Sequence, residues 1–318
     1  MTSERLRVSI GVTAYNEEAN IGRLLEALLA QELATVEISE IIVVASGCTD
    51  RTHEIVESYA AKDPRVRLLV QPRREGKTAA INLFLSQAKE DIVVVQSGDT
   101  LVRHDTIEHL IKPFFDPTIG MTGAQKVPVN ASDQFIGYMS HLRLQLEHQL
   151  CLEVPRLGEL IAFRKLIDAI PTDVAMDEAF MEAFIIQRGL RVVYAPNAVV
   201  YNMGPESIAE FIRQRRRNHA GHLHLKHKYG YKVASLNSAV VARLAAQEIY
   251  RLLRMVVFIF TAGALELFAR MLGAYDYYIR GRKHVIWEMA WSTKRVDLEK
   301  ASLPPAVAPR PPGLREAK

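Results

Sequence analysis

The sequence predicts an α/β fold in which a mostly parallel sheet is flanked by helices. Through the first third of the chain, apolar runs rich in β-branched residues alternate with segments of helical periodicity, a pattern typical of βαβ units. The run Ile-Val-Val-Val at 92–95 is typical of a strand that is buried on both faces. Each run ends in a polar or glycine-containing turn, and in open α/β sheets such turns form the ligand-binding edge.

Length and composition narrow the class of protein. The chain has 318 residues, of which 49% are hydrophobic and 24% are charged, which suits one large α/β domain with an appendage. The formal net charge of +4 is too small to indicate a nucleic-acid partner. Because Cys48 and Cys151 are far apart and residues 1–8 contain no apolar leader, we expect a cytoplasmic protein without a disulfide framework.

Four strands and three helices are expected in the amino-terminal part. The strands are 6–14, 40–45, 66–70 and 92–96, and two of the helices are 52–61 and 77–88. The first helix is expected to follow Asn16, a suitable N-cap, with Glu17 and Glu18 in its first turn. Apolar residues then recur at helical spacing, at Ile21, Leu24, Leu25, Leu28 and Leu29.

The loops that follow these strands are expected to meet at one place. Right-handed crossovers bring all such loops to the same edge of a parallel sheet. The side chains that should converge there are Tyr15, Asn16, Glu17, Ser46, Asp50, Lys77 and Asp99. This convergence favours a binding site over a set of unrelated turns.

The second half of the chain is expected to be more varied. Strands are predicted at 119–127, 159–163, 191–195 and 198–201, and helices at 133–153, at 177–188 and from Pro205 onward. Gly189 is suited to end the second of these helices, because glycine readily adopts the left-handed conformation of a C′ residue. The last helix carries several arginines and four histidines up to His227, and we expect it to form a solvated basic surface.

The carboxyl-terminal region has a different composition. Residues 240–279 are expected to be helical and strongly apolar, but their longest uncharged run, 255–265, is too short for a typical membrane span. A helix that lies on a membrane surface and a buried core helix both fit this pattern. Residues 303–318 are rich in proline and are predicted to be a disordered tail.

Six short motifs occur in one order along the chain. They are Thr-Ala-Tyr-Asn-Glu-Glu (13–18), Ala-Ser-Gly-Cys-Thr-Asp-Arg-Thr (45–52), Glu-Gly-Lys-Thr-Ala-Ala-Ile-Asn (75–82), Ser-Gly-Asp-Thr (97–100), Asp-Glu (177–178) and Gln-Arg-Arg-Arg-Asn (214–218). In this order they resemble the motifs of the family 2 glycosyltransferases, which are inverting enzymes of GT-A fold. The resemblance covers residues 8–221.

The resemblance implies roles for individual residues. Asp99 matches the metal-binding position of the family and would hold Mg²⁺ or Mn²⁺, which stabilises the charge on a departing diphosphate. Glu178 falls at the position of the catalytic base, with Asp177 as the alternative. The residues implied in binding the nucleotide-sugar are Thr13, Tyr15, Glu17, Ser46, Asp50, Lys77, Ser97, Gln214 and Arg217. Among them, Lys77 and Arg217 would face the diphosphate.

Three positions depart from the family pattern. Ser46 replaces an Asp that contacts the base, and Ser97 replaces the first Asp of Asp-x-Asp, so the metal loop has one carboxylate fewer. Asn218 replaces a Trp that marks processive synthases. This last difference favours transfer of a single sugar over polymerisation.

The expected protein is a metal-dependent, inverting glycosyltransferase at the cytoplasmic face of the membrane. It would move a sugar, expected to be UDP-linked, to a lipid-linked or polysaccharide acceptor. The expected division is a GT-A catalytic domain over 1–229, a membrane-interfacial helical region over 230–300 and a disordered tail over 301–318. A non-catalytic nucleotide-sugar-binding or partner subunit of a membrane glycan assembly complex is the alternative. A sugar nucleotidyltransferase is disfavoured, because the loop at 13–18 lacks the expected Gly-rich, Arg-containing sequence.

Overall fold

The protein is built on a single mixed sheet that runs through the centre of the fold. The computed structural model describes residues 5–231, 242–243, 246 and 256–282. The 8-stranded sheet has the order β3-β2-β1-β4-β7-β6-β8-β5. Its strands are β1 (Leu6–Ala14), β2 (Val36–Ser46), β3 (Val66–Gln71), β4 (Ile92–Ser97), β5 (Thr100–Val102), β6 (Ile119–Pro128), β7 (Leu160–Arg164) and β8 (Arg191–Asn202). β1 to β4 pair in parallel, as do β6 and β8, whereas β7 is antiparallel to both β4 and β6. The predicted α/β class is therefore confirmed.

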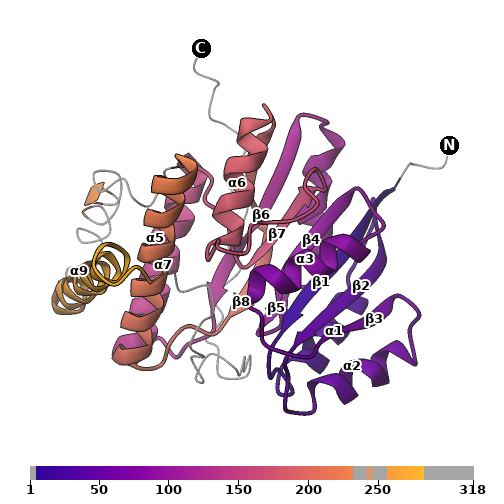
Figure 1. Cartoon of the computed structure of the whole chain (residues 1–318), viewed down its shortest axis with the longest axis horizontal. Coiled ribbons are helices and arrows are strands. Elements are labelled where there is room, and N and C mark those ends of the chain that lie inside the picture. Colours follow the sequence, from indigo (N-terminus) through magenta and orange to yellow (C-terminus); the bar gives the residue numbers. More distant parts are fainter. Residues whose placement is uncertain (1–4, 232–241, 244–245, 247–255, 283–318) are drawn as a thin grey trace.

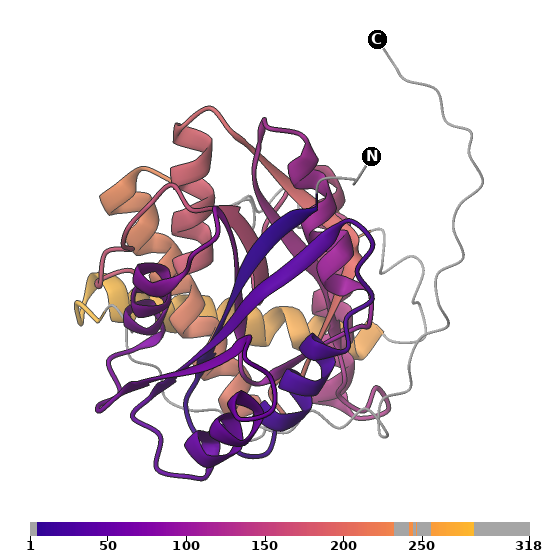
Figure 2. The same ribbon diagram turned by 90° about the vertical axis from the view of Figure 1, so that its right-hand side faces the viewer.

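Helices cover both faces of this sheet (Figure 1). They are α1 (Ile21–Leu29), α2 (Thr52–Ala60), α3 (Lys77–Gln87), α4 (Thr106–Ile111), α5 (Phe135–Glu153), α6 (Asp177–Gln187), α7 (Ile208–Tyr229) and α9 (Val256–Tyr278), with a 3₁₀ turn at Lys112–Phe115. One core cluster joins α1 and α4 to the sheet, and a second joins α3 and α6 to the opposite face. In Figure 2 the amino-terminal strands lie in front and α9 lies behind them.

Strand β4 has apolar side chains on both faces of the sheet, so helices must pack on both faces. Ile92 and Val94 belong to one core cluster, while Val93 and Val95 belong to the other. All four side chains are buried, which contributes about 1.5–3 kcal/mol for each one of this size. The predicted central strand therefore fixes the position of the turn that follows it.

The first helix starts later than its sequence suggests. α1 begins at Ile21, so the expectation that Asn16 caps it is wrong. Asn16 instead has φ +53, and its side chain accepts a hydrogen bond from Thr49 N at 2.9 Å and donates one to Thr49 Oγ1 at 3.3 Å. Asparagine tolerates the left-handed region, and here it joins the loop after β1 to the loop after β2.

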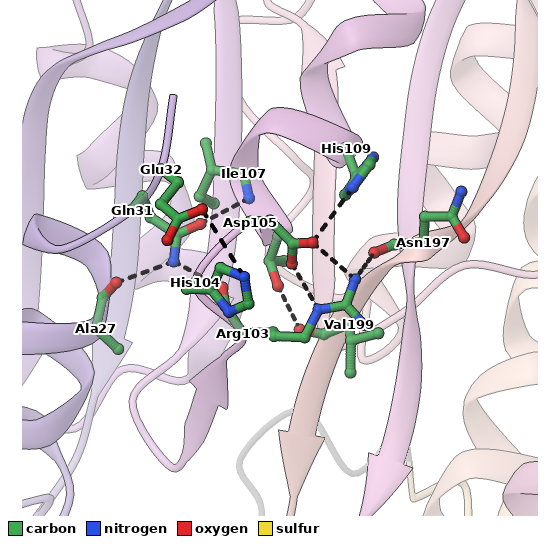
Figure 3. Close-up of polar contacts among 11 residues, drawn as sticks. Ala27, Gln31, Glu32, Arg103, His104, Asp105, Ile107, His109, Asn197 and Val199 are labelled. Carbon is green, nitrogen blue, oxygen red and sulfur yellow. Dashed lines mark hydrogen bonds and ion pairs between the residues drawn. The ribbon is translucent and has the colours of Figure 1, made fainter. Parts of the chain in front are cut away.

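The segment of β5 and α4 was not anticipated from the sequence, and side chains anchor it at several points (Figure 3). Gln31 Nε2 donates to Arg103 O at 2.7 Å, while Gln31 Oε1 accepts from Ile107 N at 2.9 Å. The guanidinium of Arg103 pairs with Asp105 at 2.5 Å and donates to Asn197 O at 2.8 Å. These contacts tie the segment to α1 and to β8.

Helices α5, α7 and α9 lie together on one side of the molecule (Figure 1). The segment Phe258–Tyr278 of α9 is long and apolar enough to cross a membrane, and only 11% of its most apolar window is buried. α9 lies within the stretch 240–279 that was expected to be helical and apolar, and it continues past residue 265, where the uncharged run ends. Most of 232–255, all of 283–300 and the expected tail 301–318 lie outside the described residues.

The expectation that α7 is a solvated basic helix is wrong for one of its faces. Arg215, His222 and His224 are all buried. Arg215 Nε lies 2.9 Å from Glu266 Oε2 of α9, and Arg216 pairs with the buried Asp276 of the same helix. Arg215 and Arg216 are therefore neutralised within the protein by acidic residues of α9 that lie far away in the sequence.

Candidate active site

A cleft opens at the carboxyl ends of the parallel strands. It has a volume of about 130 Å³ and is lined by Thr13, Ala14, Tyr15, Glu17, Ser46, Arg74, Gly76, Lys77, Ala80, Ser97 and Asp99. Most of the residues predicted to bind donor or metal are among these, whereas Asp50, Gln214 and Arg217 are not. The loops after β1, β2, β3 and β4 thus meet at one edge, as right-handed parallel topology requires.

Asp99 is held in a tight turn between β4 and β5. Gln96 Nε2 donates to Thr100 Oγ1 at 3.0 Å, and Thr100 Oγ1 donates to Ser97 O at 2.8 Å. Gly98 N also donates to Thr13 O of β1 at 2.9 Å. These bonds fix the backbone on both sides of Asp99, so its carboxylate is pre-oriented beside the cleft.

The loops after β2 and β3 touch at a glycine. Gly47 has φ +65, and a Cβ atom there would lie 2.5 Å from Arg74 N. This close approach admits only glycine without movement. Arg74 in turn lies over the ring of Tyr15, with its guanidinium carbon 4.1 Å from the ring centroid, a cation–π contact. Arg74 therefore belongs to the cleft, although its residue type and its position in the sequence do not indicate this.

Asp50 and Glu17 order the loops after β2 and β1, although only Glu17 lines the cleft. Asp50 accepts hydrogen bonds from Glu18 N at 3.0 Å and from Thr52 Oγ1 at 2.6 Å. Burial alone would raise the pKa of Asp50, but these bonds lower it. Glu17 accepts a hydrogen bond from Asn20 Nδ2 at 2.9 Å and is buried against the cleft. Asp50 thus joins the two loops, and Glu17 orders the loop after β1 beside the cleft.

An ion cluster closes the other side of the cleft. Lys77, the first residue of α3, points to the first residues of α6. Lys77 Nζ lies 2.5 Å from Glu178 Oε1 and 3.2 Å from Asp177 Oδ2. These three side chains are mostly buried, with 16%, 12% and 2% exposure respectively. Lys77, which is predicted to face the diphosphate, therefore pairs with both candidates for the catalytic base.

The two carboxylates of this cluster titrate in opposite directions. Burial and the negative charge of Glu178 raise the pKa of Asp177, and Lys77 only partly opposes this effect. Burial would also raise the pKa of Glu178, but the charge and hydrogen bond of Lys77 lower it. A single ammonium can balance one carboxylate at close range. Glu178 therefore carries the negative charge, and Asp177 is the member of the pair that holds a proton more readily.

Glu159 and Arg217 complete the charged surroundings. Glu159 precedes β7 and has φ +63, a conformation that is costly for a residue with a Cβ atom and that clusters at functional sites. Its pKa is raised by burial and by the charge of Asp99. Burial lowers the pKa of Arg217 to about 10, while Glu159, Glu178 and Asp99 oppose that shift. The carboxylates of Glu159 and Asp99 therefore share one electrostatic environment with Arg217.

Gln214 lies one turn before Arg217 on α7. Its Oε1 atom is buried and accepts no hydrogen bond from the residues that the structure describes. Such an atom is costly to bury without a donor. Gln214 thus presents an acceptor that a bound ligand or water could satisfy.

Comparison with known sequences identifies the family. The sequence model of glycosyl transferase family 2 matches residues 9–178, more than half of the chain. An N-acetylglucosaminyltransferase from Sinorhizobium fredii is 23% identical over 235 residues, which cover 66% of this chain and 56% of the relative. A poly-β-1,6-N-acetyl-D-glucosamine synthase from Staphylococcus aureus is 28% identical over 218 residues, covering 65% and 52%. A dolichyl-phosphate β-glucosyltransferase from Trichomonas vaginalis is 30% identical over 152 residues, covering 42% and 45%. The chain thus spans about half the length of these relatives.

Comparison with solved structures supports the fold. A mannosyltransferase from Pyrobaculum calidifontis, solved in complex with GDP-Man and Mn²⁺, superposes with a TM-score of 0.59. The two chains are 23% identical, and the match covers 88% of this chain and 87% of the other. The likeness extends through most of the chain and agrees with the sheet described above.

Proposed function

Because the chain belongs to glycosyl transferase family 2, we propose that it is an inverting, metal-dependent glycosyltransferase. It moves a sugar from a nucleotide-sugar, expected to be UDP-linked, to a hydroxyl of a lipid-linked or polysaccharide acceptor. One observation carries this proposal: Lys77 joins the donor cleft, which contains Asp99, to the carboxylates of Asp177 and Glu178. The proposed cation ligand Asp99 and the candidate base are therefore linked through one lysine, an arrangement that suits displacement at an anomeric carbon.

The residues around Asp99 fit a divalent cation. The charge of Asp99 raises the pKa of the half-buried Glu159, so a cation between the two carboxylates would relieve their repulsion. No group of three or more His, Cys, Asp or Glu side chains with metal-binding geometry occurs among the described residues. Mg²⁺ commonly uses only one or two carboxylates together with phosphates and water. Bound there, Mg²⁺ or Mn²⁺ stabilises the negative charge of the leaving diphosphate.

Lys77 couples donor binding to the state of the base. Its ammonium neutralises Glu178 at 2.5 Å and lowers the pKa of that carboxyl. A diphosphate in the cleft attracts the same ammonium. As the ammonium turns to the diphosphate, the proton affinity of Glu178 rises, and this carboxylate can accept the proton of the acceptor hydroxyl. Arg217 supplies a second positive charge near the same carboxylates.

Helix α9 supports a location at a membrane. Its three charged residues pair within the protein: Glu266 with Arg215 and Arg270, and Asp276 with Arg216. Its outer face consists of apolar residues that are 47–68% exposed, such as Phe260, Leu267, Phe268 and Met271. A helix on a water-facing surface has the opposite arrangement. We infer that the outer face contacts lipid, on the cytoplasmic side where nucleotide-sugars are expected.

The proposal is tested by removing one carboxylate charge. The full chain is incubated with a panel of nucleotide-sugars and Mn²⁺, and release of nucleoside diphosphate is measured for the wild type, Asp99→Asn and Asp116→Asn. Asp116 is an exposed carboxylate paired with Arg191, outside the cleft, so its substitution is the matched control. We expect turnover of one donor by the wild type and the control, and a loss of about 100-fold or more in Asp99→Asn.

Two results would contradict the proposal. Equal turnover by the wild type and Asp99→Asn would exclude the role of Asp99 in metal binding. Donor-dependent thermal stabilisation without turnover of any donor would favour a nucleotide-sugar-binding partner subunit, because a bound ligand raises apparent stability without chemistry.

A further inference from the structure

A second pocket lies between α5, α7 and α9, away from the donor cleft. It has a volume of about 220 Å³ and shares no lining residue with that cleft. Most of its surface is apolar, contributed by side chains such as Leu142, Leu146 and Phe211. Charged side chains also line it, namely Arg143, Glu147, Arg156, Arg215, Glu266 and Arg270. The pocket is therefore amphiphilic.

Its charged side chains carry an excess of positive charge. Glu147 alone contacts three cations: Lys126 at 2.5 Å, Arg143 at 2.9 Å and Arg156 at 3.1 Å. Glu266 likewise contacts both Arg215, at 2.9 Å, and Arg270, at 3.0 Å. Among the residues that the structure describes, two carboxylates thus contact five cations, and burial of uncompensated charge is costly. An anion in the pocket would compensate the surplus.

Burial and crowding strengthen this conclusion at Arg215. Its side chain is 10% exposed. Burial lowers the pKa of Arg215, and the nearby charges of Arg143 and Arg156 lower it further, although Glu266 opposes them. The guanidinium groups of Arg143, Arg156 and Arg215 therefore repel one another at the charged end of the apolar pocket. Guanidinium groups bind phosphate oxygens through paired hydrogen bonds, so a phosphate is the anion that suits this end.

The pocket lies between the apolar helix α9 and charged residues near the candidate active site. On one side it is lined by Ile259 and Gly263 of α9, the helix whose outer face is apolar and exposed. On the other side, Lys126 contacts Glu147 of the pocket, and a Cβ atom at Gly158 would lie 3.4 Å from Lys126 Nζ. Gly158 directly precedes Glu159, so the charged end of the pocket lies near the residues around Asp99.

We propose that this pocket binds a phosphate-bearing lipid, and that this lipid carries the acceptor hydroxyl. The phosphate contacts Arg143, Arg156 and Arg215, and the hydrocarbon chain follows the apolar wall toward α9. The role as acceptor rests on the proposed function. In the transfer, the hydroxyl oxygen bonds to the anomeric carbon, the bond from that carbon to the diphosphate breaks, and the hydroxyl proton passes to Glu178. The diphosphate leaves with the bonding electron pair.

The binding site is tested on the full chain with dodecyl phosphate as the probe. Calorimetry compares it with dodecyl maltoside, which has a neutral head, and with inorganic phosphate, which has no chain. We expect dodecyl phosphate to bind at least about tenfold more tightly than either, because both ends of the pocket contribute. Equal affinity for the phosphate and the maltoside, or equal affinity for dodecyl phosphate and inorganic phosphate, would overturn the proposal.

Two substitutions locate the site. Gly263→Leu fills the apolar wall, and a Cβ atom at Gly263 meets no other atom within 4 Å, so the helix tolerates the change and gains propensity. It should weaken binding of dodecyl phosphate about tenfold or more. Ala264→Leu, on the same helix but outside the pocket lining, should bind as the wild type does. Wild-type affinity in Gly263→Leu would contradict the assignment.

A third substitution tests the charged end of the pocket. Arg143→Gln leaves Glu147 paired with Lys126 and Arg156, so a buried carboxylate is not left unpaired. It should reduce the preference for dodecyl phosphate over dodecyl maltoside by about tenfold, the value of one strong charge-assisted contact. An unchanged preference would overturn the assignment of the phosphate to this end.

Failure of this inference can be separated from failure of the proposed function. A chain that turns over a nucleotide-sugar but shows no preference for dodecyl phosphate would retain the proposed function and lose the lipid site. A chain that binds dodecyl phosphate in this pocket but neither binds nor turns over a nucleotide-sugar would keep the lipid site and lose the acceptor role.

Discussion

Lys77 determines which of two adjacent carboxylates carries the negative charge at the start of α6. Its ammonium lies closer to Glu178 than to Asp177, at 2.5 Å against 3.2 Å. Asp177 is also the more deeply buried of the two, so its ionised form loses more hydration. The charge difference follows from the position of one amine on a neighbouring helix, and it makes the two carboxylates chemically distinct.

This asymmetry predicts different costs for removing each carboxylate. Glu178→Gln removes the ionised group and should lower turnover by about 100-fold to 10,000-fold, the usual contribution of a general base. Asp177→Asn removes the group that holds its proton more readily and should cost about tenfold or less. Initial rates at saturating donor and metal measure both. A larger loss in Asp177→Asn than in Glu178→Gln would transfer the role of base to Asp177.

The raised pKa of Asp177 predicts how stability depends on pH. In the unfolded chain an aspartate loses its proton near pH 4, whereas folded Asp177 retains its proton to higher pH because of burial and Glu178. Between these values the folded state binds more protons, so the free energy of unfolding decreases as pH rises. Asp177→Asn removes this term and should therefore stabilise the protein relative to the wild type, increasingly from pH 4 to about pH 7, to which the pKa of folded Asp177 is raised. Thermal unfolding across that range tests it, and a stabilisation that shrinks as pH rises would contradict the assignment.

Some residues of the candidate site could be predicted from the sequence and others could not, for physical reasons. Lys77 and Asp99 directly follow a turn or a strand end, so their sequence position alone brings them to the correct edge. Arg74 is one of two adjacent arginines in a loop, and its contact with Tyr15 depends on how two distant loops meet. Glu159 precedes a short strand, and its φ of +63 cannot be inferred from its residue type.

At the scale of elements, the strands with continuous apolar runs were predictable almost to the residue. β4 is such a run, and β1 was recognised by its alternation of apolar with polar or small residues. β5 is three residues long, and α4 is six residues long. Segments of this length contain too little periodicity to be recognised. Their conformation depends on contacts to α1 and β8, which the sequence does not display.

The loop contact at Gly47 gives a prediction at this scale. Gly47→Ala would force alanine to adopt φ +65 and would press a Cβ atom to 2.5 Å from Arg74 N. We expect a loss of about 1–2 kcal/mol in the free energy of unfolding from the backbone conformation. We also expect weaker nucleotide binding, because the displaced loop carries Arg74 and leads to Lys77. Thermal unfolding and nucleotide titration measure the two effects.

Gly189 provides a matched control for that substitution. It has φ +76 at the end of α6, and a Cβ atom there would meet nothing within 4 Å. Gly189→Ala should therefore lower stability by a similar backbone cost of about 1 kcal/mol but leave nucleotide affinity unchanged. If both variants lost the same affinity, the contact between the two loops would not be the cause.

At the scale of the whole molecule, the positions of charge and apolar surface on α9 indicate how the protein meets its surroundings. The helix directs Glu266 and Asp276 toward the arginines of α7 and exposes apolar side chains on the other side. The charges at 266 and 270, which interrupt the apolar segment of the sequence, are therefore paired inside the protein, as is the charge at 276. Among the described residues, the exposure of side chains such as Leu267 favours an interfacial helix over a buried core helix.

Membrane association should therefore depend on the outer face of α9. Leu267 is 60% exposed, and Leu267→Glu introduces a charge where we expect lipid, while no contact inside the protein is removed. Partition onto vesicles of phosphatidylcholine with phosphatidylglycerol should fall about tenfold or more, because a charge resists transfer into the apolar layer. Co-flotation of the full chain measures this partition.

Phe115→Glu alters a side chain with 50% exposure next to β6, away from α9, and should float as the wild type does. If both variants lost binding equally, added negative charge rather than the face of α9 would explain the loss, and α9 would need another partner for its apolar surface.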